Sequence, residues 1–287
     1  MKQASLYIVA TPIGNRADIS QRAIEVLSEV DVIAAEDTRH SGQLLHYYNI
    51  SRPMLAYHDH NEAQQAEHIL QRLREGASVA LISDAGTPLM SDPGYRLVKA
   101  AQQAGIPVSP IPGPCAAVAA LSASGLATDQ FCFVGFPPAR STARKNFFQG
   151  LSQHTATLVF YESSHRIMDS IRDMLEVFGD SRTAVLAREL TKKFETIRQA
   201  SLSELLIWLG SDSNQQKGEF VLLLEGNPPR EATEEFNLEL DHILKVLLDE
   251  LPVKQASQLA ARISGLKKNQ VYKRALLLKD EIERASF

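Results

Sequence analysis

Short apolar runs alternate with amphipathic stretches along the first part of the chain. The runs at 6–10, 32–35, 79–82 and 108–111 have the length of strands, and turn-forming or polar residues follow each of them. Between these runs, apolar residues recur at helical spacing. Strands and helices that alternate over connections of a few residues indicate an α/β fold with a parallel sheet.

A second series of apolar runs begins at residue 131. Strands are expected at 131–136, 157–161, 184–187 and 220–224. Polar and small residues at 124–130 separate the two series. We therefore expect two α/β domains, at residues 1–125 and 126–228.

The composition changes sharply after the last expected strand. Gly226-Asn227-Pro228-Pro229-Arg230 has the composition of a linker. Residues 231–251 carry seven acids against one base, whereas residues 254–287 carry eight bases against three acids. We expect a third, helical domain at residues 229–287.

The last segment holds two amphipathic helical patterns, at 253–263 and 269–282, with a turn at Gly265 between them. A short helix pair with glycine at the joint fits a helix-turn-helix. Four basic residues at the second helix would then contact nucleic acid: Lys267, Lys268, Lys273 and Arg274. The alternative is a helical packing appendage with a solvated basic face.

Bulk composition narrows the class of protein. Of the 287 residues, 44% are hydrophobic and 22% are charged, which is ordinary for a globular protein. We expect a cytoplasmic protein, because no apolar run has bilayer-spanning length, the N-terminus lacks a signal-peptide pattern, and Cys115 and Cys132 are the only cysteines. The net charge of −4 argues against non-specific coating of nucleic acid but leaves room for a local basic face.

The stretch 83–94 lies between an expected strand and an expected helix. It holds two each of Gly, Pro, Ser and Asp in twelve residues. Gly86 and Gly94 allow positive φ and a close ligand approach, and Pro93 is expected to open the next helix with Asp92 as its N-cap. A stiff polar loop at the carboxyl end of a strand is where open α/β sheets bind ligands; the alternative is a plain strand-to-helix turn.

Polar loops follow four other apolar strands, at 11–15, 36–39, 162–166 and 188–193. In a two-domain α/β protein such loops are expected to converge on a cleft. The sequence contains no P-loop, no dinucleotide-binding glycine motif and no nucleophile elbow, so the loops indicate a binding cleft for a polar small molecule. His58 and His60 flank Asp59, but without a third ligand nearby we expect no metal site.

Eight short motifs occur in order between residues 5 and 225. They are Val9-Ala10-Thr11-Pro12-Ile13-Gly14-Asn15, Ala35-Glu36-Asp37-Thr38-Arg39, Ser83-Asp84-Ala85-Gly86-Thr87-Pro88, Ser91-Asp92-Pro93-Gly94, Pro112-Gly113-Pro114, Tyr161-Glu162-Ser163-Ser164-His165-Arg166, Arg188-Glu189-Leu190-Thr191-Lys192 and Lys217-Gly218-Glu219-Phe220-Val221. Together they resemble the tetrapyrrole-methylase superfamily of S-adenosylmethionine-dependent methyltransferases, and most closely its ribosomal RNA branch. The superfamily position often written Gly-Asp-Pro is Ser83-Asp84-Ala85 here, the form typical of the RNA branch, which lowers the case for a porphyrin-type substrate.

The resemblance implies two α/β domains with S-adenosylmethionine bent in the cleft between them, and a homodimer. It implies cofactor contacts at nine positions: Pro12, Ser83, Asp84, Ala85, Met90, Ser91, Tyr161, Ala187 and Gly218. Backbone groups of Ala85 and Gly218 are expected to bind polar ends of the cofactor, and Met90 and Tyr161 to cover the adenine. For Tyr161, packing in an apolar core is the alternative.

The resemblance further implies 2′-O-methylation of a cytidine in the decoding region of 16S ribosomal RNA, within the 30S subunit. Two alternatives stay open: a small-molecule methyltransferase of the tetrapyrrole type, and a non-catalytic nucleic-acid-binding module. Methyl transfer from a sulfonium is an in-line displacement, and a positioned base would help a neutral ribose hydroxyl to react.

The loop beside the cofactor loop supplies the candidate catalytic residues. Glu36 and Asp37 are the expected bases, and Arg39 is expected to hold a substrate phosphate. The alternative is a structural ion-pair cluster of these three residues. For RNA phosphates we also expect contacts from three residues of a basic loop: Arg140, Arg144 and Lys145. A solvated basic face is the alternative for this loop.

Overall fold

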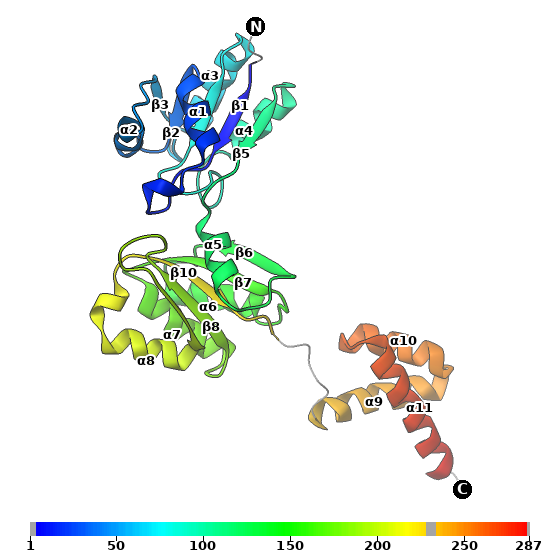
Figure 1. Ribbon diagram of the computed structural model, residues 1–287. Helices are drawn as coiled ribbons and strands as arrows, with labels where there is room; N and C mark the ends of the chain where they lie inside the picture. Colours follow the sequence, from blue (N-terminus) through cyan, green and yellow to red (C-terminus); the bar gives the residue numbers. More distant parts are fainter. Residues whose placement is uncertain (1–3, 228–233, 286–287) are drawn as a thin grey trace. The chain divides into compact units, whose positions relative to one another are not determined.

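The computed structural model describes residues 4–227 and 234–285, and the chain divides into two compact units between Gly226 and Asn227. The first unit contains two sheets, each with its own helices, and the second unit is helical (Figure 1). Residues 228–230 of the expected linker, and with them the expected boundary at 228, lie outside the described residues.

The first sheet has five parallel strands in the order β3-β2-β4-β1-β5, as the alternation of strands and helices predicts. Its strands are β1 (Leu6–Val9), β2 (Val32–Ala35), β3 (Met54–Ala56), β4 (Val79–Ile82) and β5 (Val108–Ile111). Its helices are η1 (Arg16–Asp18), α1 (Gln21–Glu29), α2 (Thr38–Tyr47), α3 (Glu62–Arg74) and α4 (Tyr95–Gln103), and α5 (Ala116–Ala123) follows β5 and packs on the second sheet. β1 and β4 are neighbours in this sheet, but the connections that follow them run in opposite directions along it, from β1 to β2 and from β4 to β5. A ligand-binding crevice is therefore expected at the carboxyl ends of β1 and β4.

The central strands of this sheet are buried on both faces because helices cover both sides (Figure 1). On one face, Leu6, Val79 and Leu81 pack with residues of α3 and α4. On the other face, Val9 and Ile82 pack with residues of α1 and α2. Burial on both faces explains why these strands are apolar at every position rather than at every second one.

The start of α4 differs from the expectation. Asp92 is not its N-cap and Pro93 is not in the helix: α4 begins at Tyr95, and its N-cap is Gly94, with φ 140° and no side-chain cap. A Cβ at Gly94 would lie 2.8 Å from Leu81 Cδ2, so this position needs both the backbone freedom and the small size of glycine.

Side chains cap two other helices of the first sheet. Ser20 caps α1 by accepting a hydrogen bond from the Ala23 N–H at 3.2 Å. Asp37 caps α2, which begins at Thr38. The expected loop 36–39 therefore ends inside a helix.

The second sheet is mixed, with five strands in the order β6-β7-β10-β8-β9. Its strands are β6 (Phe131–Gly135), β7 (Thr157–Ser163), β8 (Thr183–Arg188), β9 (Thr196–Ser201) and β10 (Glu219–Leu224). Its helices are α6 (Ser141–Leu151), α7 (Ile167–Phe178), α8 (Leu202–Ser211) and η2 (Ser213–Gln216). Only β6 and β7 are parallel among these strands, since β10 is antiparallel to both of its neighbours and β8 is antiparallel to β9. The chain thus has the expected α/β class with two sheets, one parallel and one mixed.

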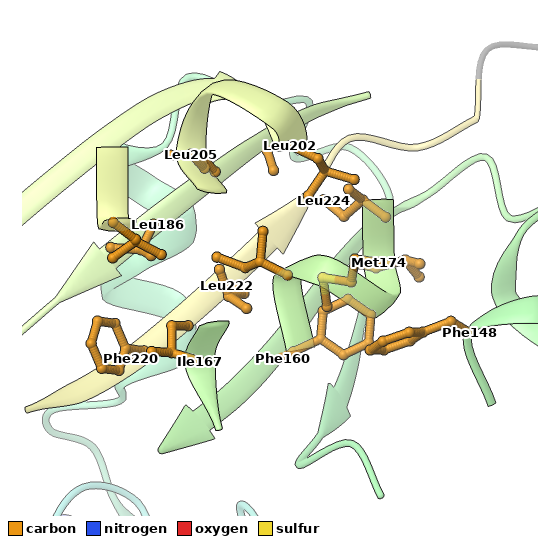
Figure 2. Close-up of a cluster of buried hydrophobic side chains, with 14 residues drawn as sticks. Phe148, Phe160, Ile167, Met174, Leu186, Leu202, Leu205, Phe220, Leu222 and Leu224 are labelled. Carbon is orange, nitrogen blue, oxygen red and sulfur yellow. The ribbon is translucent and has the colours of Figure 1, made fainter. Parts of the chain in front are cut away.

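A large apolar core lies between the second sheet and helices α6, α7 and α8. Figure 2 shows Phe160, Leu186 and Leu222 on neighbouring strands of the sheet, together with Phe148 of α6 and Met174 of α7. All five side chains are buried. This core holds the sheet rigid beneath the loops that follow its strands.

The opposite face of the second sheet is covered by α5, the helix that follows β5. Ala117 and Leu121 of α5 form one buried cluster with Val159 and Val221 of the sheet. Ile13, from the loop after β1, belongs to the same cluster. This packing brings the loops of the first sheet against the second sheet.

The helical unit consists of α9 (Glu234–Glu250), α10 (Val253–Ser264) and α11 (Lys268–Ala285) around a small apolar core. Gly265 ends α10 in the left-handed conformation with φ 72°, at the expected turn. Helix α9 was not expected, because its many acidic residues made its apolar positions hard to recognise in the sequence. Leu240 and Leu244 of this helix are buried. Among the described residues, no helix combines the length and apolar character needed to cross a membrane.

Candidate active site

Residues at or near the ends of strands in both sheets line one pocket with a volume of 470 Å³. From the first sheet and α5 they are Ile13, Glu36, Asp84, Ala85, Gly86, Thr87, Met90, Asp92 and Ala116. From the second sheet they are Phe136, Tyr161, Glu162, Ser163, Ser164, Ala187, Leu190, Gly218, Glu219, Phe220 and Val221. The volume is in the range of pockets that hold small-molecule ligands, roughly 300–1,000 Å³.

The loop 83–94 is anchored to the loops beside it. Thr11 and Gly86 exchange two backbone hydrogen bonds, at 2.9 Å and 3.1 Å, and the Thr11 hydroxyl donates to the Ser83 carbonyl at 3.1 Å. The Thr87 hydroxyl donates to the Pro114 carbonyl at 2.9 Å. Gly86 has the positive φ expected for it, 85°. The loop therefore presents a fixed backbone to the pocket.

Gly218 leaves a stretch of bare backbone in the opposite wall of the pocket. Its φ is 103°, and a Cβ there would lie 2.5 Å from Glu189 Oε1. That carboxylate oxygen also accepts hydrogen bonds from the Glu219 N–H at 3.0 Å and from Lys192 Nζ at 2.9 Å. Because Glu189 is held in place, no side chain fits at residue 218, and a ligand can reach the backbone.

Five acidic residues line this pocket, and three of them, Glu36, Asp84 and Asp92, come from the loops of the first sheet and interact electrostatically. Burial, and then the negative charges of Asp92 and Asp84, raise the pKa of Glu36 to about 7. Burial also raises the pKa of Asp92, against a hydrogen bond from Ser83 that lowers it. Such a cluster favours a cationic ligand, which relieves the repulsion between carboxylates, and a pKa near neutrality suits Glu36 to take up a proton.

Asp37 has a different environment from Glu36, although the two are adjacent in sequence. Its Oδ1 accepts hydrogen bonds from the N–H groups of Arg39 and His40 at 2.8 Å and 3.4 Å, and its Oδ2 lies 3.2 Å from Arg39 Nη2. These contacts, first among them the side-chain hydrogen bond from Arg39, lower the pKa of Asp37 to about 2. Asp37 does not line the pocket. The ion-pair alternative therefore describes Asp37 and Arg39, whereas Glu36 stands apart from them.

Six of the nine expected cofactor contacts line the pocket: Asp84, Ala85, Met90, Tyr161, Ala187 and Gly218. Pro12 instead lines a second pocket of 300 Å³ that adjoins the first. Ser83, the first residue of the loop 83–94, is buried, and Ser91 is exposed with a φ of 72°; neither lines the first pocket.

Tyr161 both lines the pocket and packs against its neighbours. Its ring meets Phe133 and Phe136 edge-on, with centroids 4.9 Å and 5.6 Å apart. Its hydroxyl accepts a hydrogen bond from the Ala117 N–H at 3.3 Å, at the start of α5. Burial raises the pKa of this hydroxyl well above its usual range. The two interpretations of Tyr161, pocket wall and packed core residue, are thus compatible.

Some lining residues were not among the expected cofactor contacts. Glu162 is buried, accepts a hydrogen bond from the Ser163 N–H at 2.8 Å and pairs with Arg166 Nη2 at 2.8 Å. Its place in the polar loop 162–166, which was expected at the cleft, was the signal in the sequence for Glu162, although the structure has this residue inside β7. Phe136 gave no such signal, because an aromatic residue at a strand end is usually part of a core; here 52% of it is exposed.

The basic loop does not form a uniform basic surface. Arg144 has only 3% of its side chain exposed, and its Nη2 lies 2.6 Å from Asp173 Oδ2. Its Nη1 also donates to the Ala139 carbonyl at 3.0 Å. The expectation that Arg144 contacts RNA is therefore wrong, because its guanidinium is engaged in a buried ion pair. Lys145 pairs with Glu176 at 2.5 Å, and Arg140 is exposed.

The basic residues of the helical unit also divide into two kinds. Lys267, Lys268 and Lys273 are exposed. Arg274 is half-buried, and its Nε donates to Asp241 Oδ1 at 2.7 Å, which ties α11 to α9. Of the four residues expected to contact nucleic acid, the three lysines are therefore the ones open to solvent.

The sequence of this chain is similar to known protein families and known proteins. Residues 5–206 match the family model of the tetrapyrrole (corrin/porphyrin) methylases, and residues 234–279 match that of the RsmI C-terminal HTH domain. A protein of Escherichia coli O157:H7 named ribosomal RNA small subunit methyltransferase I is 54% identical over 274 residues, which cover 96% of this chain and 95% of that protein. A protein of the same name from Haemophilus influenzae is 51% identical over 267 residues, which cover 93% of this chain and 94% of that protein.

Solved structures extend the comparison to the fold. The crystal structure of uroporphyrin-III-C-methyltransferase from Thermus thermophilus matches with a TM-score of 0.56 at 23% identity, over 78% of this chain and 94% of that one. At this identity the match shows a shared fold. From the match of the family model and the identity to these relatives over nearly the whole chain, we conclude that the chain belongs to the tetrapyrrole methylase family, among the proteins named ribosomal RNA small subunit methyltransferase I.

Proposed function

We propose that the protein transfers a methyl group from S-adenosylmethionine to the ribose 2′-oxygen of a cytidine in the 16S RNA of the small ribosomal subunit. The observation that carries this proposal is the pocket of 470 Å³, where an anchored loop, bare backbone and the carboxylates of Glu36, Asp84 and Asp92 meet. Family membership supports methyl transfer, and the names of the relatives support small-subunit ribosomal RNA as the substrate.

The lining of the pocket fits the chemistry of S-adenosylmethionine. Glu36 and Asp92 supply negative charge for a cationic sulfonium and an ammonium group. The bare backbone at Gly218 offers hydrogen bonds to polar ends of the cofactor, and Met90 and Tyr161 offer apolar cover for the adenine. When bound, the cofactor supplies an activated methyl group, and the protein supplies position and electrostatics.

Glu36 is the residue that accepts the proton of the ribose hydroxyl in this mechanism. With a pKa of about 7, its carboxylate is largely ionised just above neutrality and still basic enough to hold the proton it takes up. Asp37 is unsuited to this step because its pKa of about 2 makes it a much weaker base and its oxygens are engaged by Arg39 and His40.

RNA contact is assigned to exposed basic residues outside the pocket. They are Arg140 of the second sheet's loop and Lys267, Lys268 and Lys273 of the helical unit. Phosphate contacts of this kind give affinity without reading the sequence, so other contacts must select the target nucleotide. We also infer a cytoplasmic homodimer, as the family resemblance implies; sedimentation equilibrium tests the dimer.

Transfer of a labelled methyl group tests the proposal. The protein is incubated with labelled S-adenosylmethionine and, in separate reactions, with 30S subunits, free 16S RNA and a porphyrinogen. We expect label in the 30S reaction, at one cytidine whose 3′ linkage becomes resistant to alkali because its 2′-oxygen is blocked. Label in the porphyrinogen supports a small-molecule enzyme instead, and RNA binding without any transfer supports a non-catalytic module.

A further inference from the structure

A second pocket, of 300 Å³, shares part of its wall with the proposed cofactor pocket. The residues common to both are Ile13, Asp84, Ala85 and Glu219. The rest of its lining includes three basic side chains: Arg16, His40 and Lys192. A molecule in this second pocket therefore lies against the same residues as a molecule in the first.

The two pockets differ in the charge of the residues that only one of them contains. The first pocket contains Glu36 and Asp92, which the second lacks, and the second contains Arg16 and His40, which the first lacks. The acidic pocket suits a cation, and the basic rim beside it suits an anion. A cationic methyl donor and a phosphodiester-linked ribose require charges in this order if the hydroxyl is to meet the methyl group at the shared wall.

Arg16 is arranged to bind a phosphate. Its guanidinium carbon lies 4.6 Å from the centre of the Tyr47 ring, and within residues 4–227 and 234–285 it makes no ion pair with a carboxylate. A cation–π contact holds a guanidinium by its flat face and leaves its N–H donors in the plane. The side chain is thus positioned while its donors remain available for the paired oxygens of a phosphate.

The backbone around Arg16 is also fixed at the mouth of the second pocket. The Asn15 N–H donates to the Thr191 hydroxyl at 3.0 Å, and the Asn15 side chain accepts from the Ala17 N–H at 3.1 Å. The Tyr48 hydroxyl donates to the Arg16 carbonyl. Contacts with the loop after β8 and with the end of α2 therefore fix the backbone at Arg16.

The size of the second pocket sets the form of RNA that it admits. At 300 Å³ it is at the lower end of small-molecule pockets, and it cannot take a stacked helix. Enzymes that act on one nucleotide of RNA use unpaired, unstacked residues or extrude the target from its stack. Resting on the proposed function, we infer that this pocket receives one unstacked nucleotide of the RNA substrate and that Arg16 binds its backbone phosphate.

Substitution of Arg16 in the full-length protein tests the inference. With 30S subunits as substrate, Arg16→Gln is expected to lower kcat/KM about tenfold, and to reduce the slope of log affinity against log salt by about 0.7, the value for one lost single-strand phosphate contact. The affinity for S-adenosylmethionine, measured by calorimetry, is expected to match that of the parent protein. The control is Arg74→Gln, which removes a surface arginine of α3 whose Nη1 lies 3.4 Å from Glu67, and which is expected to change none of these quantities.

Tyr47 provides a second test, because it is expected to act only through Arg16. Tyr47→Leu removes the ring and should weaken RNA binding several-fold, whereas Tyr47→Phe keeps the ring and should not. Adding Tyr47→Leu to Arg16→Gln should cause no further loss, since the residue that it positions is already gone.

The outcomes separate this inference from the proposed function. Transfer to 30S subunits by the parent protein, with an unchanged salt slope and kcat/KM in Arg16→Gln, overturns the inference alone. Binding of 30S subunits that weakens in Arg16→Gln, without any methyl transfer by the parent protein, supports the inference and overturns the proposed function. A parent protein that neither binds nor methylates 30S subunits overturns both.

Discussion

The backbone N–H of Asp37 donates to Asp84 Oδ1 at 3.0 Å, while the backbone of Asp84 hydrogen-bonds the Glu36 carboxylate. Since β2 and β4 are neighbours, this exchange joins the loops that follow them. It holds Glu36 at the pocket beside Asp84 and leaves Asp37 to cap α2. Two acids that are adjacent in sequence thereby acquire pKa values of about 7 and about 2.

Replacement of Glu36 by Gln is expected to lower the rate of methyl transfer by about 100-fold or more, the usual effect of losing a general base. Cofactor affinity should change far less, because the neutral amide has the same shape and Asp84 and Asp92 remain at the pocket. The matched control is Asp37→Asn, which keeps a good N-cap for α2 and should transfer methyl groups nearly as fast as the parent protein. Full activity in Glu36→Gln combined with loss in Asp37→Asn would assign the base to Asp37.

The raised pKa of Glu36 predicts a pH dependence of activity. The carboxylate acts as a base only when ionised, so kcat/KM should rise with pH and level off above the pKa of about 7. Single-turnover rates from pH 5.5 to 8.5 give the profile. In Glu36→Gln the residual rate should lack this step, and a profile of unchanged shape would exclude Glu36 as its origin.

The same pKa predicts how stability depends on pH. Folding raises the pKa of Glu36 from 4.5 to about 7, so between these values the folded state holds more protons than the unfolded state. The contribution of Glu36 to the free energy of unfolding is therefore present below pH 4.5 and is lost as pH rises through 7. Urea unfolding at pH 5 and pH 8 should show a smaller loss of stability across this range in Glu36→Gln than in the parent protein. An equal loss in both would contradict the assigned pKa.

Substitution of Gly218 tests the bare wall of the pocket. In Gly218→Ala the new Cβ would lie 2.5 Å from Glu189 Oε1 at a φ of 103°, so either the wall or Glu189 must move. Calorimetric titration with S-adenosylmethionine should show affinity reduced at least about tenfold, the effect of a misplaced hydrogen-bonding edge. The control is Gly210→Ala in α8, where a Cβ meets nothing within 4 Å. That change should leave cofactor binding intact and stabilise the helix by about 0.5–1 kcal/mol.

The sequence was informative where one segment determines its own structure. The central strands of the first sheet are apolar at every position, which predicts a parallel sheet buried on both faces. The turn residues at 83–94 predict a ligand-binding loop at the carboxyl end of a strand. Strand direction in the second sheet could not be predicted this way, because an apolar run such as 220–224 looks the same whether its neighbours are parallel or antiparallel. The burial of Arg144 was equally hidden, since its partner Asp173 is distant in sequence and meets it only after α6 and α7 pack.

The buried pair of Arg144 and Asp173 predicts a loss of stability rather than of RNA binding. Arg144→Leu leaves the Asp173 carboxylate buried without its cation and should lower the free energy of unfolding by about 3–5 kcal/mol. Arg144→Leu combined with Asp173→Leu should recover part of this loss, because no charge then remains buried. Thermal unfolding measures both. If Arg144→Leu were as stable as the parent protein and bound RNA more weakly, the residue would regain its role in RNA contact.

The lysines of the helical unit are expected to contribute affinity for RNA and nothing to the cofactor site. Replacement of Lys267, Lys268 and Lys273 together by Gln should reduce the slope of log affinity for 30S subunits against log salt by up to about 2, or about 0.7 for each lost phosphate contact. The affinity for S-adenosylmethionine should be unchanged, because the lining of its proposed pocket comes from residues 13–221. Arg at the same three positions keeps the charges and should restore the slope, which separates lost charge from a disturbed fold. An unchanged slope in the Gln variant would leave α11 as a packing element and shift the phosphate contacts to the loops of the two sheets.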